Sequence, residues 1–209
     1  MEFTFERNVR ITALLLLTLV VTQAVYTGLF VAEIAGPRPL LWGLEAVLFT
    51  FLAAFAGAAL VQTRNYHIGW SAIAFSAVLN VVQVSIGLKL FGPFGGVAQQ
   101  AEAMAPLIGA VVAFSFMIYN TAKILLGFAA LIFGMAKMNA GGESSGVKSV
   151  GVKSLGGLTA LAGVVAIVAN SFMVIFGRDA FLPSPVAGVS GVVATVLLAL
   201  CLMSIARDD

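Results

Sequence analysis

The sequence predicts an all-α fold: a polytopic transmembrane bundle of six helices in a single domain spanning residues 1–209. Hydrophobic residues make up 61% of the 209 residues and charged residues only 10%, against about 45–50% and about 25% in soluble domains. The apolar residues also gather in segments long enough to cross a bilayer. Because a soluble fold could not bury this much apolar surface, we expect the lipid bilayer to be the main solvent.

The first three helices are expected at 11–35, 40–62 and 66–91. The first apolar run is longer than the roughly 7–15 residues of a signal peptide, so we interpret it as a retained helix. Prolines mark two of the helix ends in this half of the chain. Pro37 and Pro39 end the first helix, and Pro93 follows the third.

The last three helices are expected at 104–137, 155–177 and 186–206. The fourth is long enough to tilt in the bilayer or to project from it. Between the fourth and fifth, the Gly- and Ser-rich residues 138–154 are the one long polar segment, and we expect a flexible cytoplasmic loop there.

The distribution of Lys and Arg predicts that both termini lie in the cytoplasm. With the N-terminus inside, seven basic residues fall on the inner side and three on the outer side. The inner set is Arg7, Arg10, Arg64, Lys137, Lys148, Lys153 and Arg207, and the outer set is Arg38, Lys89 and Arg178. We therefore expect a multi-pass protein of a prokaryotic cytoplasmic (inner) membrane.

A weak internal repeat is consistent with three helical hairpins of similar plan. Asn80 is followed by Gly87 and Pro93, and Asn170 by Gly177 and Pro183, at the same spacings. In a chain this rich in Gly and Ala, chance explains such a match equally well.

Small residues also recur at helical spacing, which lets helix backbones approach closely. They include Gly127 and Gly134 in the fourth expected helix, and Gly156 and Gly163 in the fifth. Ala53 and Gly57 form a similar pair in the second. We expect these faces to pack within the bundle, with an oligomer as the alternative.

Polar side chains near the middle of membrane helices are the candidate site, because they are expensive to hold in lipid. Lys123 is the strongest candidate, since helix–helix adhesion by hydrogen bonding does not require a charge. The other members of the candidate substrate or ion site are Gln23, Asn80, Gln83, Tyr119, Asn120 and Asn170. The alternative is that the Asn and Gln side chains simply hydrogen-bond between helices, at about 0.6 kcal/mol each.

Glu33 and Glu45 are the expected acidic partners, both in the outer half of the bilayer. Two neighbouring carboxylates could bind a cation or hold a proton. A plain structural pairing with Lys89 or Arg178 is the alternative.

Several chemistries are disfavoured by composition. His67 is the only histidine and Cys201 the only cysteine, so haem ligation, a catalytic zinc site and a serine–histidine nucleophile all lack their residues. We therefore expect no cofactor and no metal. The net charge of +2 is small and the basic residues are scattered along the chain, so nucleic acid is not an expected partner.

Three functions remain open at this stage. The first is a small-solute or ion transporter or channel, because Lys123 lies among polar residues. The second is a structural or accessory subunit of a larger membrane complex, because the chain has almost no soluble mass. The third is a membrane enzyme acting on lipid, which the missing His and Asp clusters make the weakest. Protein partners would be a second copy or other subunits of a complex.

Overall fold

The protein is described by a computed structural model that covers residues 3–34, 36–91, 103, 105–140, 147–177 and 184–208. Within these ranges the chain is all-helical, without strands, and six helices are long and apolar enough to span a membrane. The predicted all-helical fold, with six helices able to span a membrane, is confirmed for these residues.

The elements differ from the predicted ones mainly at their ends. In chain order they are α1 (Phe5–Val31), α2 (Arg38–Gln62), α3 (His67–Ile86), the π-helical turn η1 (Gly87–Phe91), α5 (Ala105–Ala140), α6 (Val147–Phe176) and α7 (Ser184–Asp208). The expected loop at 138–154 is shorter in the structure, because α5 continues to Ala140 and α6 begins at Val147. Gly and Ser disfavour helix only weakly, so a helix held by its apolar part can extend through them.

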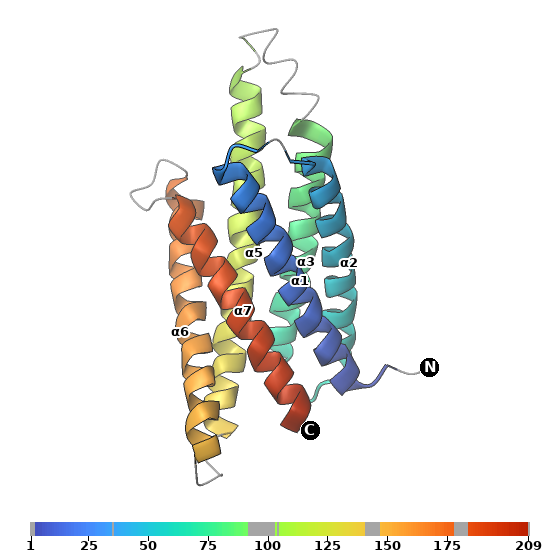
Figure 1. The fold of residues 1–209 in the computed structure, drawn as a ribbon, viewed down its shortest axis with the longest axis vertical. Coiled ribbons are helices and arrows are strands. Elements are labelled where there is room, and N and C mark those ends of the chain that lie inside the picture. The colour runs from blue at the N-terminus through green and yellow to red at the C-terminus, as the bar shows by residue number, and fades with distance from the viewer. Residues whose placement is uncertain are drawn as a thin grey trace.

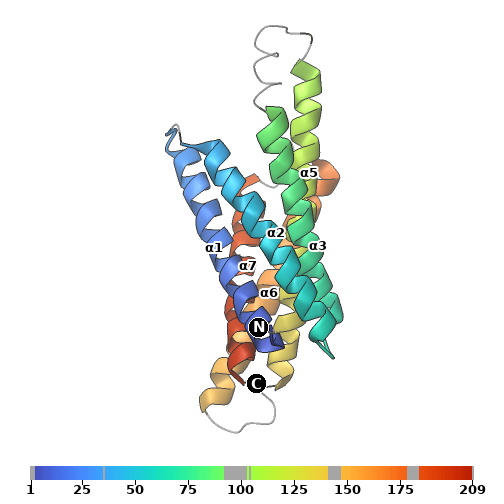
Figure 2. The same cartoon turned by 90° about the vertical axis from the view of Figure 1, so that its right-hand side faces the viewer.

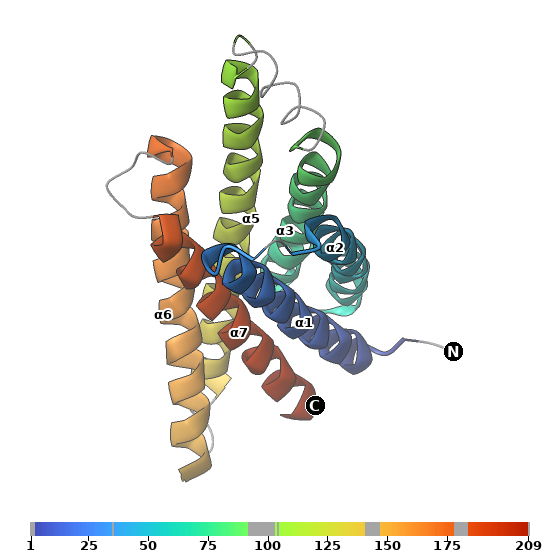
Figure 3. The same ribbon diagram turned by 45° about the horizontal axis from the view of Figure 1, so that its top comes forward.

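The six long helices form a closed ring in which each helix packs on its neighbours in the chain and α7 returns to α1. In addition, α7 packs on α5, whereas α1 and α5 do not pack on each other. Figure 1 shows α7 slanting across the more upright α6 and α5, and Figure 3 also shows α1 running beside α7. Because the backbones of α1 and α5 do not approach each other, a contact between these two helices requires long side chains.

Both termini lie at the same end of the bundle, together with the α2–α3 turn (Figure 1). The α1–α2 turn lies at the opposite end, as Figure 2 also shows. This is the arrangement that an even number of membrane crossings requires. Which side of the membrane each end faces stays a prediction.

Helices α5 and α6 approach each other most closely, along a seam of glycines. A Cβ added to Gly134 would lie 2.5 Å from the backbone nitrogen of Ala160 and 2.7 Å from the carbonyl oxygen of Gly156. A Cβ on Gly127 would lie 2.8 Å from the carbonyl oxygen of Gly163. The internal packing expected of these glycines is thus present, since the missing side chains let the two backbones touch.

The outer surface is apolar, as lipid requires. Exposed side chains on α2 include Val47, 51% exposed, and Val61, 85% exposed, and on α6 Ile175 is 70% exposed. The 36 residues of α5 make it about 54 Å long at 1.5 Å per residue, more than the roughly 30 Å hydrocarbon core. It projects beyond the neighbouring helices in Figure 1.

Candidate functional site

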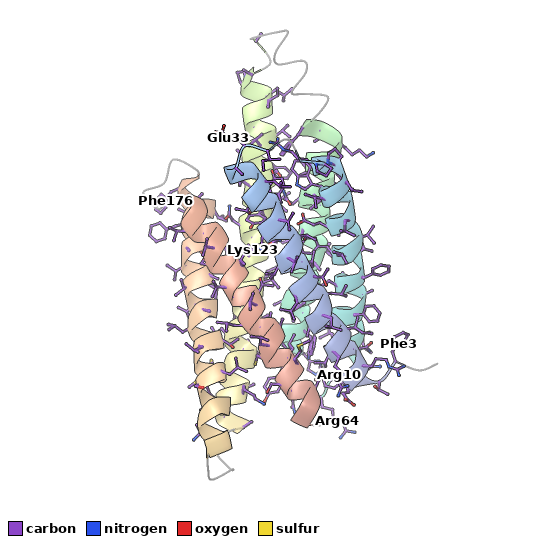
Figure 4. The ribbon with its side chains drawn as sticks, viewed as in Figure 1. Phe3, Arg10, Glu33, Arg64, Lys123 and Phe176 are labelled. Carbon is purple, nitrogen blue, oxygen red and sulfur yellow. The ribbon has the colours of Figure 1, made fainter. Side chains whose placement is uncertain are left out.

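Lys123 lies inside the bundle, in the middle of α5, and is 1% exposed. Its Nζ donates a hydrogen bond of 2.9 Å to Oε1 of Gln23 on α1. The same Nζ lies 5.2 Å from the ring centre of Tyr119, one turn earlier on α5, in a cation–π arrangement. Figure 4 places Lys123 between Glu33 at one end and Arg10 and Arg64 at the other. The long lysine side chain thus joins two helices that do not pack on each other.

Glu45 of α2 is the second buried charged group at this level, and it is 6% exposed. Its Oε1 accepts a hydrogen bond of 2.9 Å from the hydroxyl of Thr22. Thr22 also donates to the carbonyl oxygen of Leu19 in its own helix, at 2.9 Å. Because Thr22 and Gln23 are consecutive in α1, one turn of this helix contacts both Glu45 and Lys123.

Glu45 and Lys123 attract each other electrostatically but do not form a direct ion pair. Each therefore keeps hydrogen-bonding capacity that its neighbours do not use. An ammonium group has three donors and an ionised carboxylate has about four acceptor positions, yet each side chain makes one hydrogen bond. We call Glu45, Thr22, Gln23, Lys123 and Tyr119 the polar centre.

Two further residues hold Lys123 in place. A Cβ on Gly191 of α7 would lie 2.8 Å from Cδ of Lys123, so the lysine stem runs across this glycine. On the other side, the hydroxyl of Ser76 in α3 donates a 2.8 Å hydrogen bond to the carbonyl oxygen of Ala122. The backbone beside Lys123 is thereby tied to α3.

The remaining candidates on α3 lie along its contact with α5. Asn80 is 1% exposed and donates to the carbonyl oxygen of Ser76 at 2.9 Å, within its own helix. Gln83 donates to the hydroxyl of Ser115 on α5 at 3.3 Å. Of these two bonds, the Gln83 bond joins α3 to α5, whereas the Asn80 bond stays within α3.

The other three candidates make no hydrogen bond to the polar centre. Asn120 bonds to the carbonyl oxygen of Phe116 at 2.7 Å and lines an apolar groove of about 280 Å³ between α5 and α6. Asn170 donates to carbonyl oxygens of Ala166 and, on α7, Ala187. Glu33 lies outside α1 in an exposed turn with a positive φ of 55°.

The expected hairpin repeat has unlike local structures at its two glycines. Gly87 is right-handed and buried, and its added Cβ would lie 3.1 Å from the ring of Trp42. Gly177 has a φ of 72° and no such neighbour. Pro93 and Pro183 fall outside the described residues, so the repeat stays a prediction.

Two residues that contact the charged groups of the polar centre, Thr22 and Gly191, are not among the candidates predicted from the sequence. Thr22 has one sequence signal, its position next to the amide of Gln23. Gly191 has no such signal, because its contact with Lys123 depends on how α7 crosses α5. Lys137, counted with the cytoplasmic residues, is only 4% exposed in the last turn of α5.

Over the part of the chain that the structure describes, six helices are long and apolar enough to cross a membrane, which indicates the class of integral multi-pass membrane proteins. No protein-family model, curated protein or solved structure matches the chain. Within the described ranges, no group of three His, Cys, Asp or Glu side chains is placed to hold a metal ion. The polar centre is therefore the feature of the molecule that bears on its function.

Proposed function

We propose that this protein is a small-solute or ion transporter or channel, and that the polar centre is its membrane-embedded site. We place it in a prokaryotic cytoplasmic membrane with both termini inside. The bias of Lys and Arg toward the end that carries the termini supports this orientation.

The observation that carries the proposal is that Lys123 and Glu45 are both buried in the bundle without pairing directly. Ionisable groups at membrane depth are costly and face interior cavities or pathways. A half-satisfied polar network is also less favourable than an apolar core. A role limited to holding helices together would be served better by apolar side chains or by a direct ion pair. Reversible binding of a solute accounts for the hydrogen-bonding positions that Lys123 and Glu45 leave unused.

The test is flux in liposomes that contain the purified full chain. The panel comprises protons, potassium, chloride, glucose and amino acids. Lys123→Ala and Lys123→Met should reduce the flux of the transported species to that of empty liposomes, while Lys89→Met at an exposed position should not. Methionine keeps the length and apolar volume of the stem. Undiminished flux in a folded Lys123 variant would sink the proposed role of Lys123.

An accessory subunit of a membrane complex is the second candidate, and one observation favours it. On α2, a Cβ on Gly57 would meet no atom within 4 Å, so the helix face at this glycine is open, whereas Ala53 one turn earlier packs against the core. Such a face suits a helix from another chain. Purification in a mild detergent tests this candidate, and recovery of a free monomer alone would count against it.

A further inference from the structure

We infer that the polar centre takes a small zwitterion, with an anionic group against Lys123 and a cationic group against Glu45. This inference rests on the proposed function and names its substrate class. Amino acids with an ammonium and a carboxylate group are the simplest members of this class.

The Lys123 side of the site calls for a hydrogen-bond acceptor. Nζ has one oxygen partner, Oε1 of Gln23, and the face of the Tyr119 ring as a second neighbour. Two N–H donors then lack an acceptor on a side chain that is 1% exposed. Because water scarcely reaches this side chain, a carboxylate on the solute would satisfy donors that are otherwise unmet.

The Glu45 side calls for a donor. Of its two carboxylate oxygens, Oε1 accepts from Thr22, and Glu45 has no further hydrogen bond. The side chain is 6% exposed. An ammonium group of the solute would supply several donors together with the opposite charge.

One solute with both charges fits better than a simple ion. A lone anion beside Lys123 would leave Glu45 unmatched, and a lone cation beside Glu45 would leave Lys123 unmatched; an unmatched buried charge is strongly unfavourable. A zwitterion matches both groups and adds no net charge to the membrane interior. The consecutive Thr22 and Gln23 hold the two protein groups at one turn of α1, which fixes the direction of the bound solute.

The experiment uses the full chain, reconstituted in lipid, with probes that separate the two charges. Glycine, β-alanine and γ-aminobutyrate carry both charges at increasing separation, whereas acetate carries only the anionic group and methylamine only the cationic group. Binding is measured as the rise in thermal midpoint, and transport as counterflow of the labelled probe. In the wild type, at least one of the three amino acids should raise the midpoint and exchange at least tenfold faster than acetate or methylamine.

Removing one charge should change the preferred probe. In Lys123→Met the remaining Glu45 should favour methylamine, and in Glu45→Gln the remaining Lys123 should favour acetate. Lys89→Met and Glu33→Gln are the matched controls, because both side chains are exposed and should leave the amino-acid preference unchanged. A change of preference, rather than a loss of signal, distinguishes a binding role from a folding defect.

The possible results separate this inference from the proposed function. Equal responses to acetate or methylamine and to the amino acids in the wild type would overturn the zwitterion class. So would Lys123-dependent flux of protons, potassium or chloride without any amino-acid response, although transport would then stand. Amino-acid binding without counterflow would keep the ligand class and overturn transport. No response to these probes, together with no Lys123-dependent flux of protons, potassium, chloride or glucose, would overturn both.

Discussion

The aliphatic stem of Lys123 on α5 lies directly against Gly191 on α7, where a Cβ would come within 2.8 Å of Cδ and 3.2 Å of Cγ of the lysine. Because glycine has no side chain, α7 leaves room for the stem to reach across to α1. The position of the Lys123 amine beside Gln23 therefore depends on a glycine in a third helix.

A large residue at position 191 should displace Lys123. For Gly191→Leu we expect a loss of about 1–3 kcal/mol in stability, the usual range for overpacking, and loss of Lys123-dependent flux. Gly188→Leu is the matched control on the same helix, because a Cβ there meets no atom within 4 Å. Thermal midpoints and flux are compared in the same lipid. If Gly191→Leu equals the wild type in both, the lysine is not held by this contact.

Removing the Gln23 acceptor should leave the Lys123 amine without an oxygen partner. For Gln23→Leu we expect a loss of about 1.5–3 kcal/mol, the range for a hydrogen bond to a charged group. Thr18→Val on the same helix should change little, since Thr18 bonds only to the carbonyl oxygen of Leu14 in its own helix. The measurement is reversible unfolding in mixed micelles. Equal stability of the two variants would contradict the importance of this bond.

Thr22 and Glu45 should show a coupling energy. In a double-mutant cycle of Thr22→Val and Glu45→Leu, we expect about 1 kcal/mol of non-additivity, between the average and the maximum found for membrane hydrogen bonds. Thr50→Val combined with Glu45→Leu is the control, because Thr50 bonds to the carbonyl oxygen of Ala46 in its own helix. Additivity in both cycles would argue against a direct interaction of Thr22 with Glu45.

The glycine seam predicts opposite effects for two chemically identical substitutions. Gly134→Ala should destabilise the protein by about 1–3 kcal/mol, because the new methyl group meets the backbone of α6, which cannot move aside easily. Gly57→Ala should be neutral or stabilising by up to about 1 kcal/mol, since alanine favours helix and the site is open. Thermal unfolding of both variants checks this, and equal effects would contradict close packing of α5 on α6.

The charge bias predicts the side of the membrane that each end faces. Green fluorescent protein fused after the C-terminus should fluoresce, and alkaline phosphatase fused at the same place should be inactive, if this end is cytoplasmic. Phosphatase inserted at Pro37, in the α1–α2 turn at the opposite end of the bundle, should be active. The reverse pattern would invert the proposed orientation.

Much of the fold could be predicted from the sequence because each membrane helix satisfies its own backbone hydrogen bonds. Length and apolarity therefore locate α2 at Arg38–Gln62, close to the expected 40–62, without knowledge of any neighbour. The start of α6 at Val147 is harder to predict. At a helix end the helix propensity of single residues is a weak guide, and polar residues outside the lipid give no apolar pattern that marks the boundary.

The site was less predictable, and Asn80 and Gln23 show why. Both are amides near the middle of apolar helices, and their sequence context does not tell them apart. Asn80 bonds back to its own helix, whereas Gln23 receives a hydrogen bond from a lysine 100 positions along the chain. Whether an amide bonds locally or reaches another helix depends on helix rotation and crossing.

The sequence by itself determined that the described part of the chain forms six helices long and apolar enough to cross a membrane, and that Lys123 and Glu45 are polar groups within them. These are local properties of single segments in lipid. Only the tertiary structure decided that Gln23, Tyr119 and Lys123 meet, that Thr22 connects Glu45 to the same turn of α1, and that Glu33 lies apart. The physical reason is that these contacts depend on how helices rotate and cross, which is set by close packing at residues such as Gly191 and Gly134.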